Sequence, residues 1–173
     1  MSDSCREWKW VLFWVKRIQR FLKSASENYK NDSYILKLDI KWFFMSIDKS
    51  ILHKKLVEFI NEKYDDNLDD RDNILYLVEK VVFNNPVKNC IIKWNKNDWQ
   101  WLPKSKSLFF AWENKGLPIW NLTSQVFANF YLDFLDKFVK KNLKIKCYGR
   151  YVDDFILIHN DKKYLTFCKN EIE

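Results

Sequence analysis

The stretch IKCYGRYVDDFILIH, residues 145–159, decides the fold. Its β-rich halves, residues 145–151 and 155–159, flank the acidic pair Asp153 and Asp154. Two runs rich in aromatic and β-branched residues on either side of a short polar segment are typical of antiparallel strands joined by a turn. The sequence therefore predicts a β-hairpin with the acidic pair at its turn.

One further strand and five helices are expected around this hairpin. Residues 34–40 form a short β-rich run, interpreted as a buried strand. The predicted helices are residues 5–23, a helix opened by Asp48 as N-cap, a helix near residues 70–83, residues 121–143 with Asn121 or Thr123 as cap, and a C-terminal helix capped by Asp161. In the Asp48 helix the expected core face is Ile51, Leu52, Leu56, Phe59 and Ile60. This order of elements predicts an α+β fold.

Residues 84–115 show no clean periodicity. Lysines and aromatic residues interleave there: Lys88, Lys93, Lys96, Lys104 and Lys106 with Trp94, Trp99, Trp101, Phe109 and Trp112. One interpretation is a β-hairpin insertion with half-buried rings. Another, compatible with the first, is a surface that faces nucleic acid, because rings stack on bases and lysines meet phosphates. The acidic stretch at residues 64–72 is interpreted as a solvated loop.

Composition bounds the class of protein. The chain has 173 residues, of which 47% are hydrophobic, so a disordered chain is excluded and one domain is expected. The longest apolar run, residues 10–15, is too short to span a bilayer, so the expected location is cytoplasmic, with no membrane partner. The net charge of +7 favours an anionic partner. The cysteines and histidines lie far apart, which argues against a zinc site.

Three carboxylates have apolar surroundings in the sequence. Asp39 ends the strand at residues 34–40, and Asp153 and Asp154 lie between apolar strand residues. A buried carboxylate needs a cation or strong donors, and a hard ion such as Mg²⁺ prefers carboxylate oxygens. The sequence therefore suggests a magnesium site. The alternative is that an Asp-Asp pair merely favours the hairpin turn.

Three segments resemble the motifs of reverse transcriptases. Tyr151-Val152-Asp153-Asp154 matches the YxDD signature of that family. The segment LKLDIKWFFMSID, residues 36–48, is similar to the first catalytic motif of the bacterial enzymes. The segment KGLPIWNLTSQVFANFYL, residues 115–132, is similar to the motif that precedes YxDD, and its S-Q pair is most like diversity-generating retroelements and related bacterial or phage enzymes. The resemblance covers about residues 20–173.

The resemblance implies a polymerase palm, with an antiparallel sheet packed on helices, incomplete fingers and no thumb. Residues 1–30 would be an N-terminal helical segment at the junction of fingers and palm, and residues 31–173 the palm, with an insertion at about residues 84–115. The implied activity is RNA-directed DNA polymerisation. It would join dNTPs to the 3′-hydroxyl of a DNA or RNA primer on an RNA template, with two Mg²⁺ ions and Mn²⁺ as an alternative metal.

The resemblance also implies residue roles. Asp39 and Asp153 would bind both metal ions, and Asp154 would complete the catalytic carboxylate cluster. The Ile40 backbone would contact the triphosphate. Phe44 would be the steric gate that excludes a ribose 2′-hydroxyl, or else plain core packing. Gln125 would border nucleotide and template, or else simply cap or pack.

Two departures from the family pattern bear on activity. Trp120 stands where the family usually has Gly, and its indole is expected to plug the nucleotide pocket unless the loop turns it outward. No segments for complete fingers or a thumb are found, so a truncated copy or one part of a split enzyme is expected, with a separate protein supplying fingers or thumb. The alternatives are a non-catalytic nucleic-acid-binding remnant or subunit, and an unrelated basic helical module in which Asp39 and Asp153 lie apart.

Overall fold

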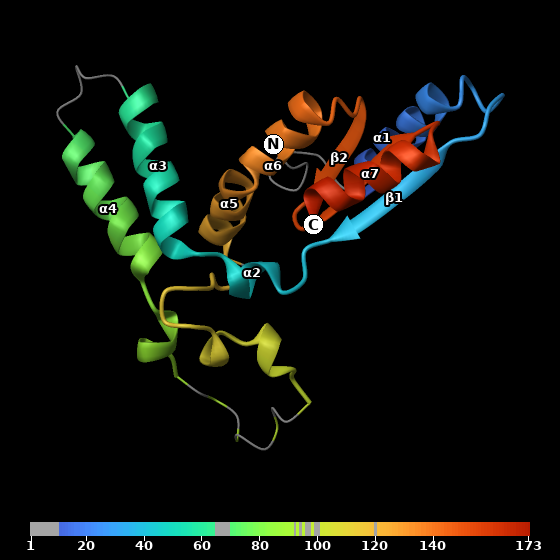
Figure 1. The fold of residues 1–173 in the computed structure, drawn as a ribbon. Coiled ribbons are helices and arrows are strands. Elements are labelled where there is room, and N and C mark those ends of the chain that lie inside the picture. The colour runs from blue at the N-terminus through green and yellow to red at the C-terminus, as the bar shows by residue number, and fades with distance from the viewer. Residues whose placement is uncertain are drawn as a thin grey trace. The chain divides into compact units, whose positions relative to one another are not determined.

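The computed structural model describes residues 11–64, 70–91, 93, 95, 98, 101–119 and 121–173. Over these residues the chain has the predicted α+β class, with seven α-helices and a three-stranded antiparallel sheet (Figure 1). It divides into two compact units. The sheet unit contains the described residues up to Lys41 and Leu132–Glu173, and the helical unit contains Trp42–Tyr131. The predicted boundary near residue 30 stays a prediction. None of the described helices is both long and apolar enough to cross a membrane.

The strands of the sheet unit follow the order β1-β3-β2, with β1 at Tyr34–Asp39, β3 at Asp154–His159 and β2 at Cys147–Tyr151. Both pairings are antiparallel, and β2 and β3 form the predicted hairpin. Val152 and Asp153 form its turn, while Asp154 is already the first residue of β3. The prediction that the first strand is buried is wrong. Among the described residues β1 pairs with β3 alone, and Ile35, Lys37 and Asp39 are exposed because β1 lies at the edge of the sheet.

One face of β2 and β3 packs against α1 (Val11–Ala25). At Gly149 the backbone of β2 lies close to α1, and an added Cβ would be 2.6 Å from the Trp14 ring. This contact requires glycine at that strand position. The cluster around it contains Cys147, Ile156, Ile158, Trp14, Ile18, Phe21, Leu22 and Ala25. The helix predicted over residues 5–23 is confirmed from residue 11 onward, and residues 5–10 lie outside the described residues.

The opposite face of the sheet carries α7 (Lys162–Ile172), which contacts β3 and β1. Side chains alternate along a strand, so His159 points away from α1, and its ring lies 5.0 Å from that of Tyr164. Asp161 caps α7, as predicted, because its carboxylate accepts hydrogen bonds from the backbone N–H groups of Lys163 and Tyr164.

The prediction of one continuous helix over residues 121–143 is wrong. The structure instead has α5 (Leu122–Tyr131), α6 (Asp133–Lys137) and a π-helical turn, η6 (Phe138–Asn142). Leu132, with φ −88° and ψ 0°, interrupts the helix between α5 and α6. In η6 the Leu143 N–H bonds to the Phe138 carbonyl, one residue further back than in an α-helix. Leu132 and Val139 are both buried, so core packing has overridden the simple α-helical period.

The helical unit contains α2 (Phe43–Ser46), α5 and the neighbouring helices α3 (Lys49–Lys63) and α4 (Arg71–Phe83), which lie side by side (Figure 1). The predicted cap is confirmed, because Asp48 accepts hydrogen bonds from the N–H groups of Ser50 and Ile51. The helix near residues 70–83 is confirmed as α4. The two helices touch through the rings of His53 and Phe83, whose centroids lie 5.4 Å apart.

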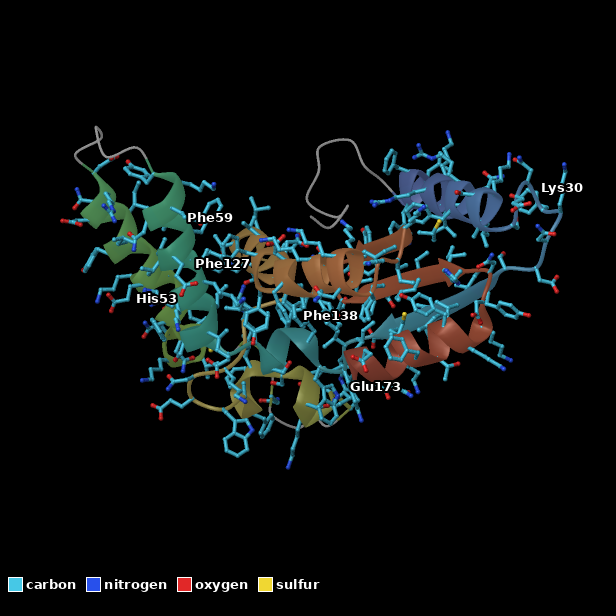
Figure 2. All side chains as sticks on the ribbon, turned by 45° about the horizontal axis from the view of Figure 1, so that its top comes forward. Lys30, His53, Phe59, Phe127, Phe138 and Glu173 are labelled. Atoms are coloured by element: carbon cyan, nitrogen blue, oxygen red, sulfur yellow. The ribbon has the colours of Figure 1, made fainter. Side chains whose placement is uncertain are left out.

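The predicted core face of α3 is right in part. Its members are the buried Leu52 and Leu56, the half-buried Ile60, and the exposed Ile51 and Phe59. Phe59 packs edge-on against Phe130 of α5, with centroids 5.1 Å apart, and still leaves 47% of its surface exposed. Figure 2 shows Phe59 on α3. The helix therefore presents two separate apolar contacts, to α4 and to α5, rather than one continuous buried stripe.

The β-hairpin interpretation of residues 84–115 is wrong for the described part of that segment. It forms short 3₁₀ turns at Pro86–Asn89, Lys104–Lys106 and Leu108–Phe110, and its one β-bridge joins Lys115 to Asp48. Prolines at the first and second turns lack an N–H for a ladder. Trp101 and Trp112 are 79% and 81% exposed rather than half-buried, and Trp94 and Trp99 lie outside the described residues.

Candidate active site

The sheet brings the two acidic motifs to one end of β1 and β3. Asp39 and Asp154 are direct register partners, so their side chains leave the same face of the sheet. The Ile40 N–H donates a 3.4 Å hydrogen bond to the Asp153 carbonyl oxygen, which joins the end of β1 to the hairpin turn. Asp39, Ile40, Asp153 and Asp154 therefore lie together, although the motifs are far apart in the sequence.

The carboxylates are more exposed than their apolar surroundings in the sequence suggested. Asp39 is exposed at the sheet edge, and Asp153 and Asp154 are half-buried. The Lys37 ammonium lies 3.1 Å from the Asp154 carboxylate, and both side chains are open to solvent, at 67% and 47% exposure. Burial alone therefore does not require a metal ion here, which corrects the premise of the sequence argument.

The negative charge of the Asp153 carboxylate is disfavoured by its surroundings. Burial raises the pKa of the Asp153 carboxyl, and the negative charges of Asp39 and Asp154 raise it further. Its own backbone N–H and that of Asp154 oppose the shift. A cation at this end of the sheet would relieve the repulsion among the three groups.

The three carboxylates are suitable ligands for a hard cation, but their side chains are not arranged around a common point. Throughout the described ranges, no three His, Cys, Asp or Glu side chains are grouped so that they could hold a metal ion. Lys37 supplies the positive charge beside Asp154. Metal binding by Asp39, Asp153 and Asp154 would thus require their side chains to turn toward a common point.

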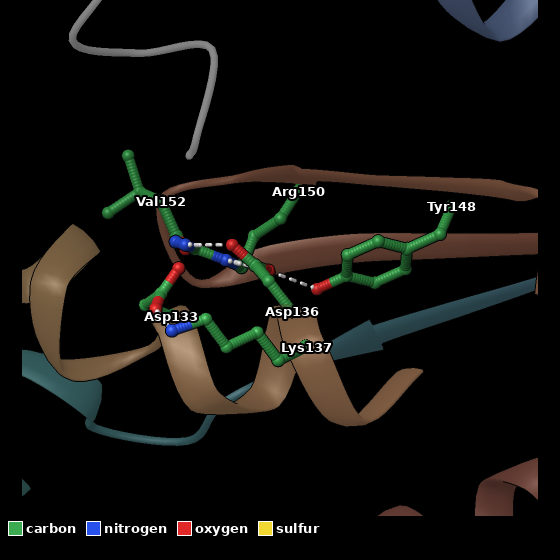
Figure 3. Close-up of polar contacts among 6 residues, drawn as sticks. All are labelled: Asp133, Asp136, Lys137, Tyr148, Arg150 and Val152. Carbon is green, nitrogen blue, oxygen red and sulfur yellow. Dashed lines mark hydrogen bonds and ion pairs between the residues drawn. The ribbon is translucent and has the colours of Figure 1, made fainter. Parts of the chain in front are cut away.

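A buried ionic network lies beneath the turn (Figure 3). Arg150 of β2 donates to both carboxylate oxygens of Asp136 of α6, through Nε at 2.9 Å and Nη2 at 2.8 Å. The Tyr148 hydroxyl donates to the same carboxylate at 2.6 Å. Burial acts to raise the pKa of Asp136, but Arg150 and Tyr148 outweigh it and hold that pKa below the ordinary value.

The sequence analysis did not identify the pairing of Arg150 with Asp136. Two signals were present. Tyr148 and Arg150 stand two residues apart on a strand, so they share a face. Asp136 is an acidic residue within an apolar helical stretch, which indicates a buried partner. Lys37 could also have been found, because it stands two residues before Asp39 on the same face of β1.

Phe44 and Gln125 belong to the helical unit and are described there. Phe44 lies in α2, is half-buried, and packs against Phe43 with ring centroids 5.4 Å apart. Gln125 lies half-buried in the first turns of α5. Asn121 is the cap of that helix, because its side chain accepts a hydrogen bond from the Thr123 N–H. Trp120 lies outside the described residues.

No model of a known protein family matches the sequence, and a search of curated proteins finds no relative.

Proposed function

We propose that this chain is the palm region of an RNA-directed DNA polymerase. The observation that carries the proposal is the pairing of Asp39 with Asp154, together with the bond from Ile40 to Asp153. These contacts join the two acidic segments that resemble the catalytic motifs of reverse transcriptases. The antiparallel sheet with helices packed on it supports the same proposal.

Asp39 and Asp153 would hold the two Mg²⁺ ions, or Mn²⁺, with Asp154 completing the cluster. The bound metals would lower the pKa of the primer 3′-hydroxyl and neutralise charge on the leaving pyrophosphate. Lys37 would leave Asp154 as the cations arrive, which costs little because exposed ion pairs are weak. The long Ile40 hydrogen bond would open to free its N–H for the triphosphate.

The remaining roles rest on the resemblance. Phe44 would be the steric gate, and Gln125 would border the nucleotide and template. The substrates would be dNTPs on a primed RNA template, and a separate protein would supply fingers or thumb.

Primer extension on an RNA template with Mg²⁺ tests the proposal. We expect incorporation by the parent chain and background signal from Asp153→Asn. Asp133→Asn is the matched control, because Asp133 is a half-exposed carboxylate of the same unit that pairs with Lys137. Equal incorporation by the parent and Asp153→Asn would contradict the metal-site assignment, and no incorporation by the parent would contradict autonomous polymerase activity.

Trp120→Gly separates a blocked pocket from missing parts. A gain of incorporation over the parent would show that the indole obstructs the site. No gain would assign the deficit to parts outside the palm, and adding a candidate partner protein that supplies fingers or thumb would then be the next comparison.

Non-catalytic nucleic-acid binding is a second candidate. Trp101 and Trp112 are almost fully exposed, and Lys104 lies 5.4 Å from the Phe110 ring centroid, so rings and cations share one segment of the helical unit. Exposed rings beside lysines can stack on bases and meet phosphates. The lack of a grouped three-ligand metal site among the described residues also favours it.

Salt-dependent binding of a primer–template, measured by fluorescence anisotropy, tests this candidate. Stacking on a base contributes about 1–3 kcal/mol, so Trp101→Ala and Trp112→Ala should each weaken binding by about fivefold to about a hundredfold. Tyr29→Ala, at an exposed ring of the sheet unit, is the control and should have no effect. Affinity that persists at high salt would contradict phosphate-driven binding.

A further inference from the structure

We propose that Asp136 and Arg150 are positioning residues, which hold the turn that carries Asp153 in one conformation. The catalytic meaning of this inference rests on the proposed polymerase function. Its structural part is that the buried Arg150 guanidinium fixes the backbone of Val152. This part can be tested without an activity assay.

Val152 has an unfavourable backbone conformation. Its φ of 59° lies in the left-handed region, which β-branched residues rarely adopt. Such a conformation is unfavourable for a residue other than glycine and persists only where surrounding contacts hold it. Because Asp153 follows directly, a change of the Val152 backbone would redirect the Asp153 carboxylate.

Arg150 supplies the contact that holds this backbone. Its Nη1 donates a 2.7 Å hydrogen bond to the Val152 carbonyl oxygen (Figure 3). The two bonds from Arg150 to Asp136 leave the guanidinium no freedom to rotate, because the paired fork and carboxylate are planar. The Arg150 and Asp136 side chains are 1% and 6% exposed, so water does not compete for these bonds.

The turn is therefore held from two sides. Arg150 bonds to the Val152 carbonyl from the face that carries α6, and the Ile40 N–H bonds to the Asp153 carbonyl from the end of β1. The Ile40 bond is long, at 3.4 Å, whereas the Arg150 bond is short. Arg150 is thus the stronger constraint, and it would persist if Ile40 turned to a triphosphate.

A buried pair could instead serve stability alone, so the test removes both charges together. Arg150→Met with Asp136→Asn leaves no unpaired charge and keeps an acceptor for the Tyr148 hydroxyl. Replacing a whole buried ion pair is often close to neutral for folding. The Val152 left-handed conformation would lose its support in this variant. Adding Val152→Gly should restore the turn, because glycine adopts positive φ without strain.

The experiment uses the full chain in four forms: parent, Arg150→Met/Asp136→Asn, the same pair with Val152→Gly, and Val152→Gly alone. The first readout is the ¹³C chemical shift of residue 152 and of its neighbours by NMR, which reports backbone conformation without substrate. We expect the left-handed signature to disappear in the double variant. Adjacent shifts should return toward parent values in the triple variant.

The second readout is Mg²⁺-dependent incorporation, with kcat and KM for dNTP measured separately. We expect kcat of the double variant to fall at least tenfold at similar KM, and the triple variant to approach Val152→Gly alone. Asp133→Asn/Lys137→Met, which removes the exposed pair of α6, should leave both readouts unchanged.

The two failures are distinguishable. Unchanged shifts at residues 152–154 in a folded double variant would overturn the positioning role. A fall in kcat that Val152→Gly does not reverse would overturn it as well. A parent chain without incorporation would overturn the proposed function, while the shifts would still decide whether Arg150 fixes the turn.

Discussion

Two acid–base pairs lie on opposite faces of one small sheet, and they differ in almost every physical respect. Arg150 and Asp136 are buried, in contact at 2.8 Å, and joined by Tyr148. Lys37 and Asp154 are 3.1 Å apart and open to solvent. The first pair fixes the backbone beneath the turn. The second is an exposed ion pair, which water and salt screen.

This difference indicates which of the two pairs holds the structure in place. A buried charge whose partner is removed is strongly destabilising, whereas an exposed pair is screened by water and salt. The turn can therefore keep its shape while the exposed Lys37–Asp154 pair opens. The following predictions test that contrast, in order of decreasing effect on the free energy of unfolding.

Arg150→Ala should have the largest effect. It leaves the Asp136 carboxylate buried without its cation, so we expect the free energy of unfolding to fall by about 3–5 kcal/mol. Urea unfolding followed by circular dichroism measures it, and Lys137→Ala is the control, since Lys137 makes an exposed pair. A loss below about 1 kcal/mol would mean that the buried pair behaves like a surface pair.

Acid gives an independent check of the same pair. The pKa of Asp136 is lowered in the folded protein, so its charged form stabilises the fold above the ordinary Asp pKa of about 3.9, and this stability disappears as pH falls through the folded value. Asp136→Asn should lack this acid-dependent part, and its stability curve should be flatter than that of the parent at low pH. Parallel curves would contradict the assignment.

Gly149→Ala should have the next largest effect, on the face that carries α1. The added Cβ would lie 2.6 Å from the Trp14 ring, and overpacking of this kind costs about 1–3 kcal/mol. Trp14→Leu should recover part of the loss when it is combined with Gly149→Ala. Thermal unfolding of the single and double variants measures the coupling. Strictly additive changes would mean that the two residues do not touch.

Asp161→Ala should have a moderate effect. Asp161 is exposed, and its partners are backbone N–H groups at the start of α7, whereas the partner of the half-buried Asp154 is the Lys37 side chain. Loss of such a cap costs about 1 kcal/mol, and Asp161→Asn should retain most of that stability. Chemical denaturation compares the two variants, and equal losses would show that charge rather than the cap geometry matters.

Lys37→Ala should have the smallest effect on stability. Exposed pairs contribute about 0.2–1 kcal/mol. The difference from the parent should vanish near 1 M salt, where the screening length is about 3 Å. Denaturation at low and high salt measures it. A loss as large as that of Arg150→Ala would remove the contrast between the two faces.

Local signals in the sequence predicted much of the fold. The hairpin followed from β-rich runs on either side of a short turn. The caps Asp48, Asn121 and Asp161 were predictable because an N-cap bonds to backbone N–H groups two or three residues away, which sequence spacing alone determines. The same spacing argument gave the starts of α3, α5 and α7.

Features that depend on distant packing were not predictable. The break at Leu132 and the exposure of Phe59 follow from which helices meet, and periodicity does not contain that information. The buried strand at residues 34–40 proved to be an edge. In the candidate site, the pairing of Arg150 with Asp136 depends on the three-dimensional position of α6 relative to β2, which the sequence does not contain.

The π-helical turn η6 affects the direction in which the chain leaves the helix before it enters β2. A π-helical turn accommodates about one residue more than an α-helical turn, and one residue corresponds to a rotation of about 100° at the end of η6. We expect that deleting either Lys140 or Lys141 would convert the turn to an α-helical one and change the direction in which the chain leaves it. We expect a one-residue deletion at the exposed Lys140 to misalign the hairpin, whereas a substitution there keeps the length of the turn and removes the contact of the Lys140 ammonium with the Tyr148 ring.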